Sequence, residues 1–258
     1  MQIGIVCIID ADEMCLKVIA GERDPRDATS FDASVADEAF PKGLSVGLPK
    51  EFLGEGLDPE CRAAVERARQ ALEGLGARTG TVSLPRTAAG IPTYYLVATV
   101  EAASNLARFD GVHFGQRRGE ADFMARTRGE GFGPEVKRRI LLGTFASSVG
   151  HSQAYYGKAL QARSLIREDF DAAFRDFDVL LTPTTPTPAF RLAEKIDPIQ
   201  MYLSDIYTVT ANLAGIPGLA MPCGVSIRGM PLGIQLLGPA RRDARLMAVA
   251  AALEGALA

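Results

Sequence analysis

The sequence predicts an α/β protein, because strand-like and helix-like segments alternate along its 258 residues. Residues 44–49 form a short apolar segment that ends at a proline, which is typical of the end of a strand. Residues 58–75 carry apolar side chains at spacings of three and four, which is the helical period. Residues 81–84 return to a strand-like pattern. An apolar content of 47% is enough for a buried core.

The first elements of the chain are a short strand over residues 3–8 and a short helix over residues 10–20. Asp10 or Asp12 is placed to cap that helix, because an aspartate side chain can accept hydrogen bonds from the first helical amides. Gly21 follows the helix, as a glycine often does at a helix end.

The helix of residues 58–75 has the clearest start signal in the chain. Asp58 is a favourable N-cap residue, and Pro59 follows it at the first helical position, where the missing amide hydrogen costs nothing. Gly74 or Gly76 is expected to end this helix.

The middle of the chain is predicted to be mainly helical. Residues 93–107 form one helix, and Pro134 opens a second that continues to about residue 145. Between them, residues 112–133 are rich in glycine and arginine and are predicted to be an irregular loop. A longer helix covers about residues 153–174.

The last third returns to strands. Residues 178–181 form a short buried strand, which is closed by the threonine- and proline-rich residues 182–188. This loop lies where α/β proteins place ligands, at the end of a strand. The remaining expected elements are a helix over 201–214, a pair of strands at 219–222 and 232–237, and a closing helix over 239–257.

The chain shows no internal repeat and no linker, so we expect one continuous unit over residues 1–258 without an internal boundary. The formal net charge is −3, which gives no overall field that would recruit nucleic acid. Residues 116–139 contain seven basic and four acidic side chains, so this segment is net +3 and the remainder −6. This segment is either a solvated surface or a local site for a carboxylate or phosphate.

Several common sites are disfavoured. The four cysteines have no Cys-x-x-Cys spacing and the chain has two histidines, so we expect no metal site. No apolar run reaches membrane-spanning length and no signal peptide is indicated, so we expect a cytoplasmic protein without membrane contact. The chain lacks a Gly-x-Ser-x-Gly elbow and a phosphate-binding loop. Ser147 and Ser148 have no lysine beside them, and we interpret them as structural helix residues.

Two segments are too specific for a generic helix. Residues 105–111 read Asn-Leu-Ala-Arg-Phe-Asp-Gly, and residues 131–140 read Gly-Phe-Gly-Pro-Glu-Val-Lys-Arg-Arg-Ile. Further blocks are Thr-Pro-Thr-Thr-Pro at 182–186 and Ala-Asn-Leu-Ala-Gly-Ile-Pro at 211–217. With these blocks the sequence resembles the amidase-signature family over nearly its whole length, and within it the A subunits of tRNA-dependent amidotransferases.

The resemblance implies a mixed β-sheet flanked by helices, with the N-terminal catalytic half of the family missing. In those A subunits glutamine is hydrolysed, and the ammonia passes to a misacylated tRNA held by a partner subunit. The implied partners are therefore glutamine, the B and C subunits of the assembly, and tRNA only through the partner subunit. No cofactor is implied for this chain, because ATP and Mg act on the partner subunit. Glu-tRNA(Gln) and Asp-tRNA(Asn) both stay open as substrates.

The resemblance also implies three substrate-binding residues, Tyr94, Arg139 and Asp205. A guanidinium can bind the glutamine α-carboxylate through two parallel hydrogen bonds, and a carboxylate can pair with the glutamine ammonium. Without the resemblance, Arg139 and Asp205 would be interpreted as charges on helix surfaces and Tyr94 as a core residue.

The chain departs from the family at the catalytic residues. The family's lysine, its serine in a cis peptide and its nucleophilic serine lie in the N-terminal half of the family. The family's Gly-Gly-Ser-Ser-Gly-Gly-Ser pattern is nowhere in the 258 residues. We therefore expect no catalytic residue here, and a chain that is inactive by itself. The alternatives are a non-catalytic binding or assembly module and a non-functional fragment.

Overall fold

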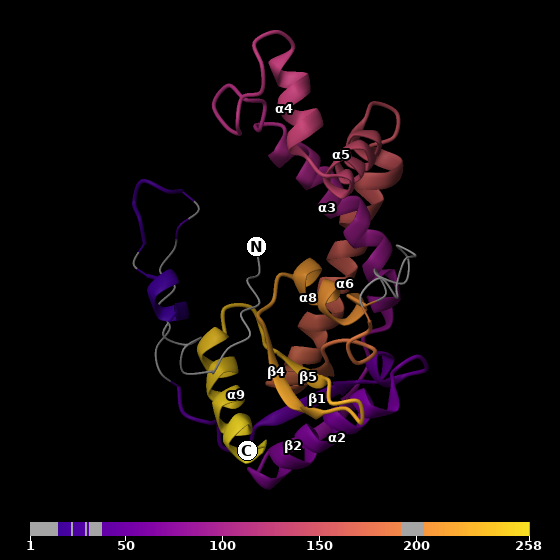
Figure 1. The fold of residues 1–258 in the computed structure, drawn as a ribbon. Helices are drawn as coiled ribbons and strands as arrows, with labels where there is room; N and C mark the ends of the chain where they lie inside the picture. The colour runs from indigo at the N-terminus through magenta and orange to yellow at the C-terminus, as the bar shows by residue number, and fades with distance from the viewer. Residues whose placement is uncertain (1–14, 22, 29, 31–37, 192–203, 258) are drawn as a thin grey trace. The chain divides into compact units, whose positions relative to one another are not determined.

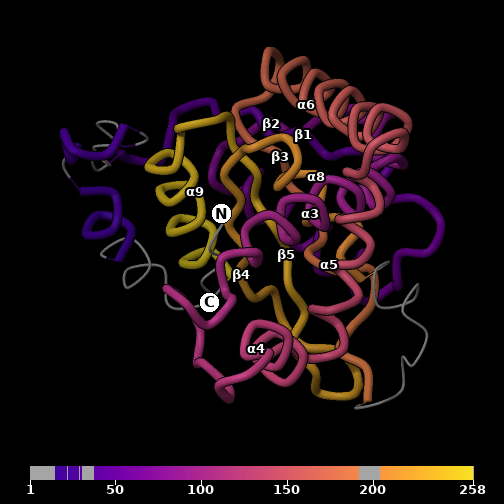
Figure 2. Tube along the Cα trace, turned by 90° about the horizontal axis from the view of Figure 1, so that it is seen from above, coloured from indigo at the N-terminus to yellow at the C-terminus, as the bar shows by residue number. Residues whose placement is uncertain are grey.

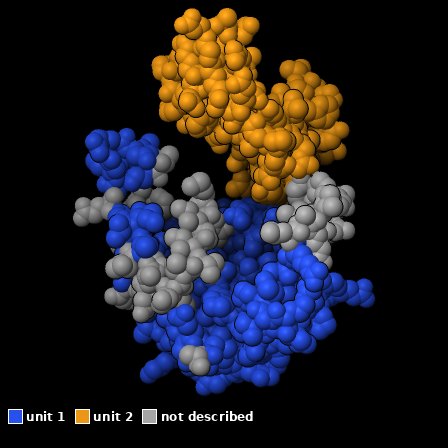
Figure 3. All heavy atoms as spheres, viewed as in Figure 1, with its two compact units in different colours: residues 1–88, 166–258 blue, residues 89–165 orange. Residues whose placement is uncertain are grey.

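The structure is a computed structural model that describes all residues except 1–14, 22, 29, 31–37, 192–203 and 258 (Figure 1). It contains two compact units, coloured separately in Figure 3. Unit 1 comprises residues 1–88 and 166–258, and unit 2 comprises residues 89–165. The expectation of one continuous domain over residues 1–258 concerns the whole chain and stays a prediction.

Unit 1 contains a five-stranded mixed sheet in the order β2-β1-β3-β5-β4. Strand β1 is parallel to its neighbours β2 and β3, whereas β5 is antiparallel to both β3 and β4. The predicted mixed α/β sheet is therefore confirmed. The strands are β1 Ser45–Pro49, β2 Arg78–Val82, β3 Val179–Pro183, β4 Gly218–Val225 and β5 Pro231–Leu237.

Helices flank this sheet (Figures 1 and 2). Helix α2, Pro59–Gly74, begins as predicted: the carboxylate of Asp58 accepts a 2.8 Å hydrogen bond from the Glu60 amide, and Pro59 occupies the first helical position. Helix α2 packs against β3, β4 and β5 and against the closing helix α9, Asp243–Leu257. The short helix α8, Ile206–Ala214, follows the residues that the structure does not describe.

The core of unit 1 is formed where these helices meet the sheet. Strand β3 is buried along its whole length, whereas no residue of β2 is buried. Leu180, Leu181 and Leu236 have no exposed surface. Apolar burial of this kind is the main stabilising term of a folded domain. The polar side chain of Gln235 is also buried, and its amide donates to Thr182 Oγ1 at 3.2 Å and to the Tyr207 carbonyl at 3.4 Å.

Unit 2 is helical. Its elements are α3 Gly90–Leu106, α4 Phe123–Gly131, α5 Pro134–Ser147, a π-helical turn Gln153–Gly157, and the first residues of α6 Lys158–Asp176, whose remainder belongs to unit 1.

The prediction of an irregular loop over residues 112–133 is wrong for α4. The glycines of this segment disfavour a helix, but local contacts outweigh that preference. Arg126 forms an ion pair with Glu130 one turn later at 3.2 Å, and Thr127 Oγ1 accepts a 3.1 Å hydrogen bond from the Arg118 amide of the preceding loop.

Other element boundaries also differ from the predictions. Strand β2 ends at Val82 rather than residue 84, because the Glu51 carboxylate binds the Ser83 hydroxyl at 2.6 Å and the Leu84 amide at 2.9 Å. The predicted strand 3–8 lies outside the described residues. Of the predicted helix 10–20, residues 15–20 are described, and residues 15–19 are helical.

Candidate functional site

The N-terminus of α5 places three charged residues close together, and Arg139 is the one that belongs to the predicted site. Gly133 precedes the helix in an extended conformation, and Pro134 takes its first position. Glu135 lies in the first turn, where a negative charge interacts favourably with the helix dipole. Arg138 and Arg139 follow three and four residues later, so their side chains come round to the side of Glu135.

A close approach of two helices brings α5 to α3. At Gly143 of α5, an added Cβ would lie 2.0 Å from the backbone oxygen of Thr99 in α3. Only glycine permits this separation. Arg139 lies one turn before Gly143, and Tyr94 lies five residues before Thr99, so the crossing sets the distance between the two predicted site residues.

The structure brings Tyr94 and Arg139 together. Arg139 Nη1 donates to the Tyr94 hydroxyl at 3.4 Å, and Arg139 Nε donates to Glu135 Oε1 at 2.8 Å. Arg138 donates to the other carboxylate oxygen of Glu135. The side chain of Arg139 is 35% exposed, so these contacts bury it only in part. The ring of Tyr94 lies edge-on to Tyr95, at 5.6 Å between centroids.

The charges in this cluster stabilise one another. The hydrogen bond from Arg139, and then that from Arg138, holds the pKa of Glu135 below its ordinary value. The Glu135 carboxylate, and then Tyr94, raises the pKa of Arg139 above its ordinary value. Near neutral pH Glu135 and Arg139 are therefore both charged, and the positive charge of Arg139 suits an anionic ligand group.

Asp205, the third predicted residue, belongs to unit 1. It is exposed and precedes the first residue of α8, where its backbone oxygen accepts hydrogen bonds from Thr208 N at 3.1 Å and Val209 N at 3.0 Å. Its side chain does not cap the helix. Tyr94 and Arg139 belong to unit 2, so a single site that includes Asp205 stays a prediction.

Glu135 is the site residue that the sequence interpretation did not assign. The available signal was its spacing of four residues from Arg139 on a predicted helix, which favours an ion pair. That spacing is common on solvated helix surfaces, so by itself it does not indicate a site.

Other reactive groups in the described part of the chain have structural roles. Ser147 Oγ donates to the Gly143 carbonyl at 2.8 Å and Ser148 Oγ to the Phe145 carbonyl at 2.7 Å, so both hydroxyls bond to their own helix. Burial raises the pKa of Cys61 to about 11, which keeps this thiol protonated and unreactive.

Metal ligands and membrane spans are not found in the described part of the chain. The described residues contain no group of three histidine, cysteine, aspartate or glutamate side chains that could hold a metal ion. Within the same residues, no helix is long and apolar enough to cross a membrane.

Comparison with known proteins identifies the class. The family model described as Amidase matches residues 7–247, which is most of the chain, and the chain therefore belongs to the amidase family. A crystal structure titled as an amidase superposes on 97% of this chain and 51% of its own, with a TM-score of 0.75 and 25% sequence identity.

Within that family the chain is similar to one kind of protein. It is 53% identical over 253 residues to the A subunit of the glutamyl-tRNA(Gln) amidotransferase of Koribacter versatilis, covering 94% of this chain and 52% of that protein. The corresponding A subunit of Myxococcus xanthus is 51% identical over 95% of this chain and 52% of its own length. The crystal structure of the Thermotoga maritima A subunit gives a TM-score of 0.69 at 33% identity, over 90% of this chain and 47% of that one. The chain thus spans about half the length of the curated relatives it matches.

Proposed function

We propose that this chain contributes the glutamine-binding part of a tRNA-dependent amidotransferase A subunit. The observation that carries the proposal is the cluster in unit 2, where Arg139 is held between the hydroxyl of Tyr94 and the carboxylate of Glu135. Support also comes from relatives at about half identity, which are A subunits of the glutamyl-tRNA(Gln) amidotransferase.

Each residue has a role that matches a part of glutamine. The guanidinium of Arg139 binds the α-carboxylate through two parallel hydrogen bonds, a geometry that lysine cannot reproduce. The carboxylate of Asp205 pairs with the α-ammonium group. The hydroxyl of Tyr94 supports the guanidinium, so that its position is set before the ligand arrives.

Hydrolysis of the glutamine side-chain amide needs an activated nucleophile and donors for the developing oxyanion. In this proposal they come from the lysine–serine–serine residues of the family, which these 258 residues do not contain. The chain alone then binds glutamine without hydrolysing it. Joined to those residues, it supports ammonia transfer to Glu-tRNA(Gln) on a B subunit, in an assembly with a C subunit that uses ATP and Mg. A cytoplasmic location follows, since aminoacyl-tRNA is used there.

A chimera tests this function. The chain replaces its matching part in the Koribacter versatilis A subunit, which then supplies the residues that this chain lacks. We expect glutamine-dependent ammonia release, and Arg139→Ala should raise KM about tenfold or more, because a charge-assisted contact to the substrate is lost. Arg138→Ala is the matched control, since it removes the same charge one residue away. Equal KM values for the two variants would contradict the proposal.

The alternative of a non-catalytic binding module rests on the buried core of unit 1, which is formed by the unit's own strands and helices. The intact mass of the protein in its source cells distinguishes the two. A mass near 27.5 kDa would mean that the chain is made as such, and the question becomes what it binds. A much larger mass would mean that the catalytic residues accompany it.

A further inference from the structure

Glu135 is the only residue of the cluster in unit 2 that carries a negative charge, and it contacts both arginines. Its Oε1 accepts a 2.8 Å hydrogen bond from Arg139 Nε, and its Oε2 accepts from Arg138. The side chain is 46% exposed, so these bonds do not serve to bury the carboxylate. Their effect is on the arginines, whose long side chains would otherwise sample many rotamers.

Two contacts fix the plane of the Arg139 guanidinium. Glu135 engages Nε, and the Tyr94 hydroxyl accepts from Nη1. A planar group bonded at two of its nitrogens cannot rotate without breaking one of these bonds. Among the interactions of the described residues, these bonds leave both hydrogens of Nη2 and one hydrogen of Nη1 as donors, so the Nη1–Nη2 end of the guanidinium can bind a carboxylate.

We propose that Glu135 is a positioning residue, which orients Arg139 so that its Nη1–Nη2 edge binds the α-carboxylate of the amino-acid ligand. This inference rests on the proposed function of Arg139 and adds a residue to it. Glu135 acts through Arg139 and does not touch the ligand. Its contribution is to order the arginine side chain before binding, which removes that entropic cost from the binding step.

The negative charge of Glu135 also opposes ligand binding, whereas its ordering of Arg139 favours it. Glu135→Ala alone would change both effects at once. A carboxylate beside Arg139 repels the ligand carboxylate, so removal of Glu135 both releases the guanidinium and reduces this repulsion. The two effects are separated by comparing Glu135→Ala with Glu135→Gln. Both variants lose the charge, but only the glutamine side chain keeps an oxygen that can accept the bond from Arg139 Nε.

The experiment measures the dissociation constant of L-glutamine by ligand-observed NMR, on the natural polypeptide that carries this chain. Glu135→Ala is expected to bind glutamine about two- to tenfold more weakly than Glu135→Gln, the range for one immobilised long side chain. Arg138→Ala should bind within about twofold of the unsubstituted protein, because the bond between Glu135 and Arg139 remains.

The α-amide of glutamine, which has no carboxylate, shows whether the effect passes through Arg139. The difference between the two Glu135 variants should be present for glutamine and absent for the α-amide. Equal affinities of the two variants for glutamine would overturn the inference. It would also be overturned if Glu135→Ala bound glutamine and the α-amide more weakly than Glu135→Gln by the same factor, because that result indicates general damage to α5. Failure of the proposed function is recognised separately: unchanged glutamine binding in Arg139→Ala, or no binding by the unsubstituted protein.

Discussion

The two compact units differ in where their stability arises. Unit 1 contains nearly all of the buried apolar side chains of the described residues, whereas unit 2 contributes Val97, Ala146 and Ala159. In contrast, Leu141 and Val149 of unit 2 are 72% and 100% exposed. The sheet of unit 1 is therefore stabilised by a conventional core. Unit 2 depends on close helix contacts and polar pairs, and the candidate site belongs to this less buried unit, as ligand sites often belong to regions of lower stability.

Two phenylalanines give the strongest test of this difference. Phe170 of unit 1 is fully buried, and Phe170→Ala should lower the free energy of unfolding by about 3–5 kcal/mol, because it leaves a cavity. Phe145 of unit 2 is 49% exposed, and Phe145→Ala should cost about 1 kcal/mol or less. Urea unfolding followed by circular dichroism measures both. Equal losses would remove the contrast between the units.

Gly143 tests whether unit 2 depends on the crossing of α3 and α5. Gly143→Ala places a methyl group against the Thr99 backbone oxygen and should destabilise unit 2 by about 1–3 kcal/mol, because the helices must separate. Gly129 in α4 is the control: an added Cβ there meets nothing within 4 Å, and Gly129→Ala should be neutral or stabilising by up to about 1 kcal/mol. Amide hydrogen exchange of α3 and α5 measures the loss of stability. Similar exchange rates in Gly143→Ala and Gly129→Ala would contradict a role of the helix crossing in stabilising unit 2.

Asp178 gives unit 1 a dependence on pH. Burial raises its pKa, but hydrogen bonds from the Ser45 amide and hydroxyl and the charge of Arg245 outweigh burial, so the net pKa lies below its ordinary value. A lowered folded-state pKa gives stability that is present above the unfolded pKa of about 4 and is lost as pH falls through the folded value.

Asp178→Asn should therefore lower the free energy of unfolding at pH 6 by about 1 kcal/mol, since the group is partly exposed. At pH 3 the difference from the unsubstituted protein should be smaller. Unfolding curves at the two pH values measure this difference. A difference that grows as the pH falls would contradict a lowered pKa of Asp178 in the folded protein.

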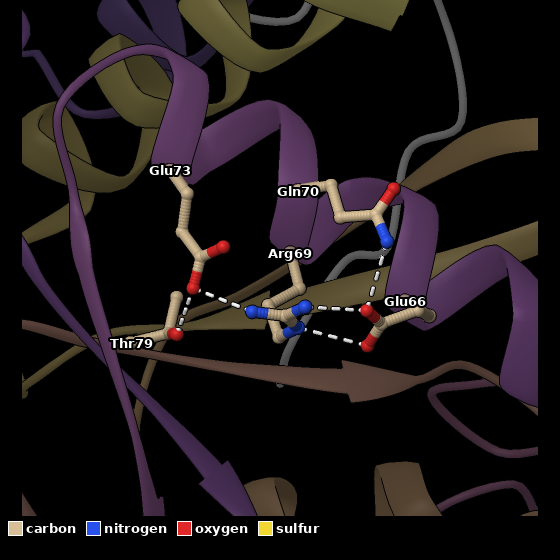
Figure 4. Close-up of polar contacts among 5 residues, drawn as sticks. All are labelled: Glu66, Arg69, Gln70, Glu73 and Thr79. Atoms are coloured by element: carbon tan, nitrogen blue, oxygen red, sulfur yellow. Dashed lines mark hydrogen bonds and ion pairs between the residues drawn. The ribbon is translucent and has the colours of Figure 1, made fainter.

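The smallest effect is expected from the polar network of Arg69, shown in Figure 4. Arg69 pairs with Glu66 and Glu73 on α2, and Glu73 also accepts from Thr79 of β2. These side chains are partly exposed, so Arg69→Ala should cost about 1 kcal/mol or less and should matter less at high salt. A loss as large as that of Phe170→Ala would mean that unit 1 depends on surface charge as much as on its core.

The fold was predictable where a local signal agreed with the tertiary contacts. The Asp58-Pro59 start of α2 and the Pro134 start of α5 were confirmed, because capping chemistry acts within a few residues. Helix α4 was missed, because its glycines disfavour a helix and part of its support comes from a loop that folds back onto Thr127. The early end of β2 likewise depends on Glu51, a residue distant in sequence.

For the candidate site, the resemblance supplied Tyr94, Arg139 and Asp205, since no residue pattern alone distinguishes them from surface or core residues. That Tyr94 and Arg139 meet could not be derived from the sequence, because it depends on the glycine-mediated crossing of two helices. The placement of Asp205 in the same site stays a prediction.

Whether Arg139 binds glutamine is tested most directly by the affinity of the natural polypeptide for L-glutamine, measured by calorimetry for the unsubstituted protein, Arg139→Ala and Arg138→Ala. We expect Arg139→Ala to lose about tenfold or more in affinity and Arg138→Ala to stay within about twofold of the unsubstituted protein. If both variants bind glutamine as the unsubstituted protein does, or lose affinity equally, Arg139 is a surface charge and the cluster in unit 2 is not a glutamine site.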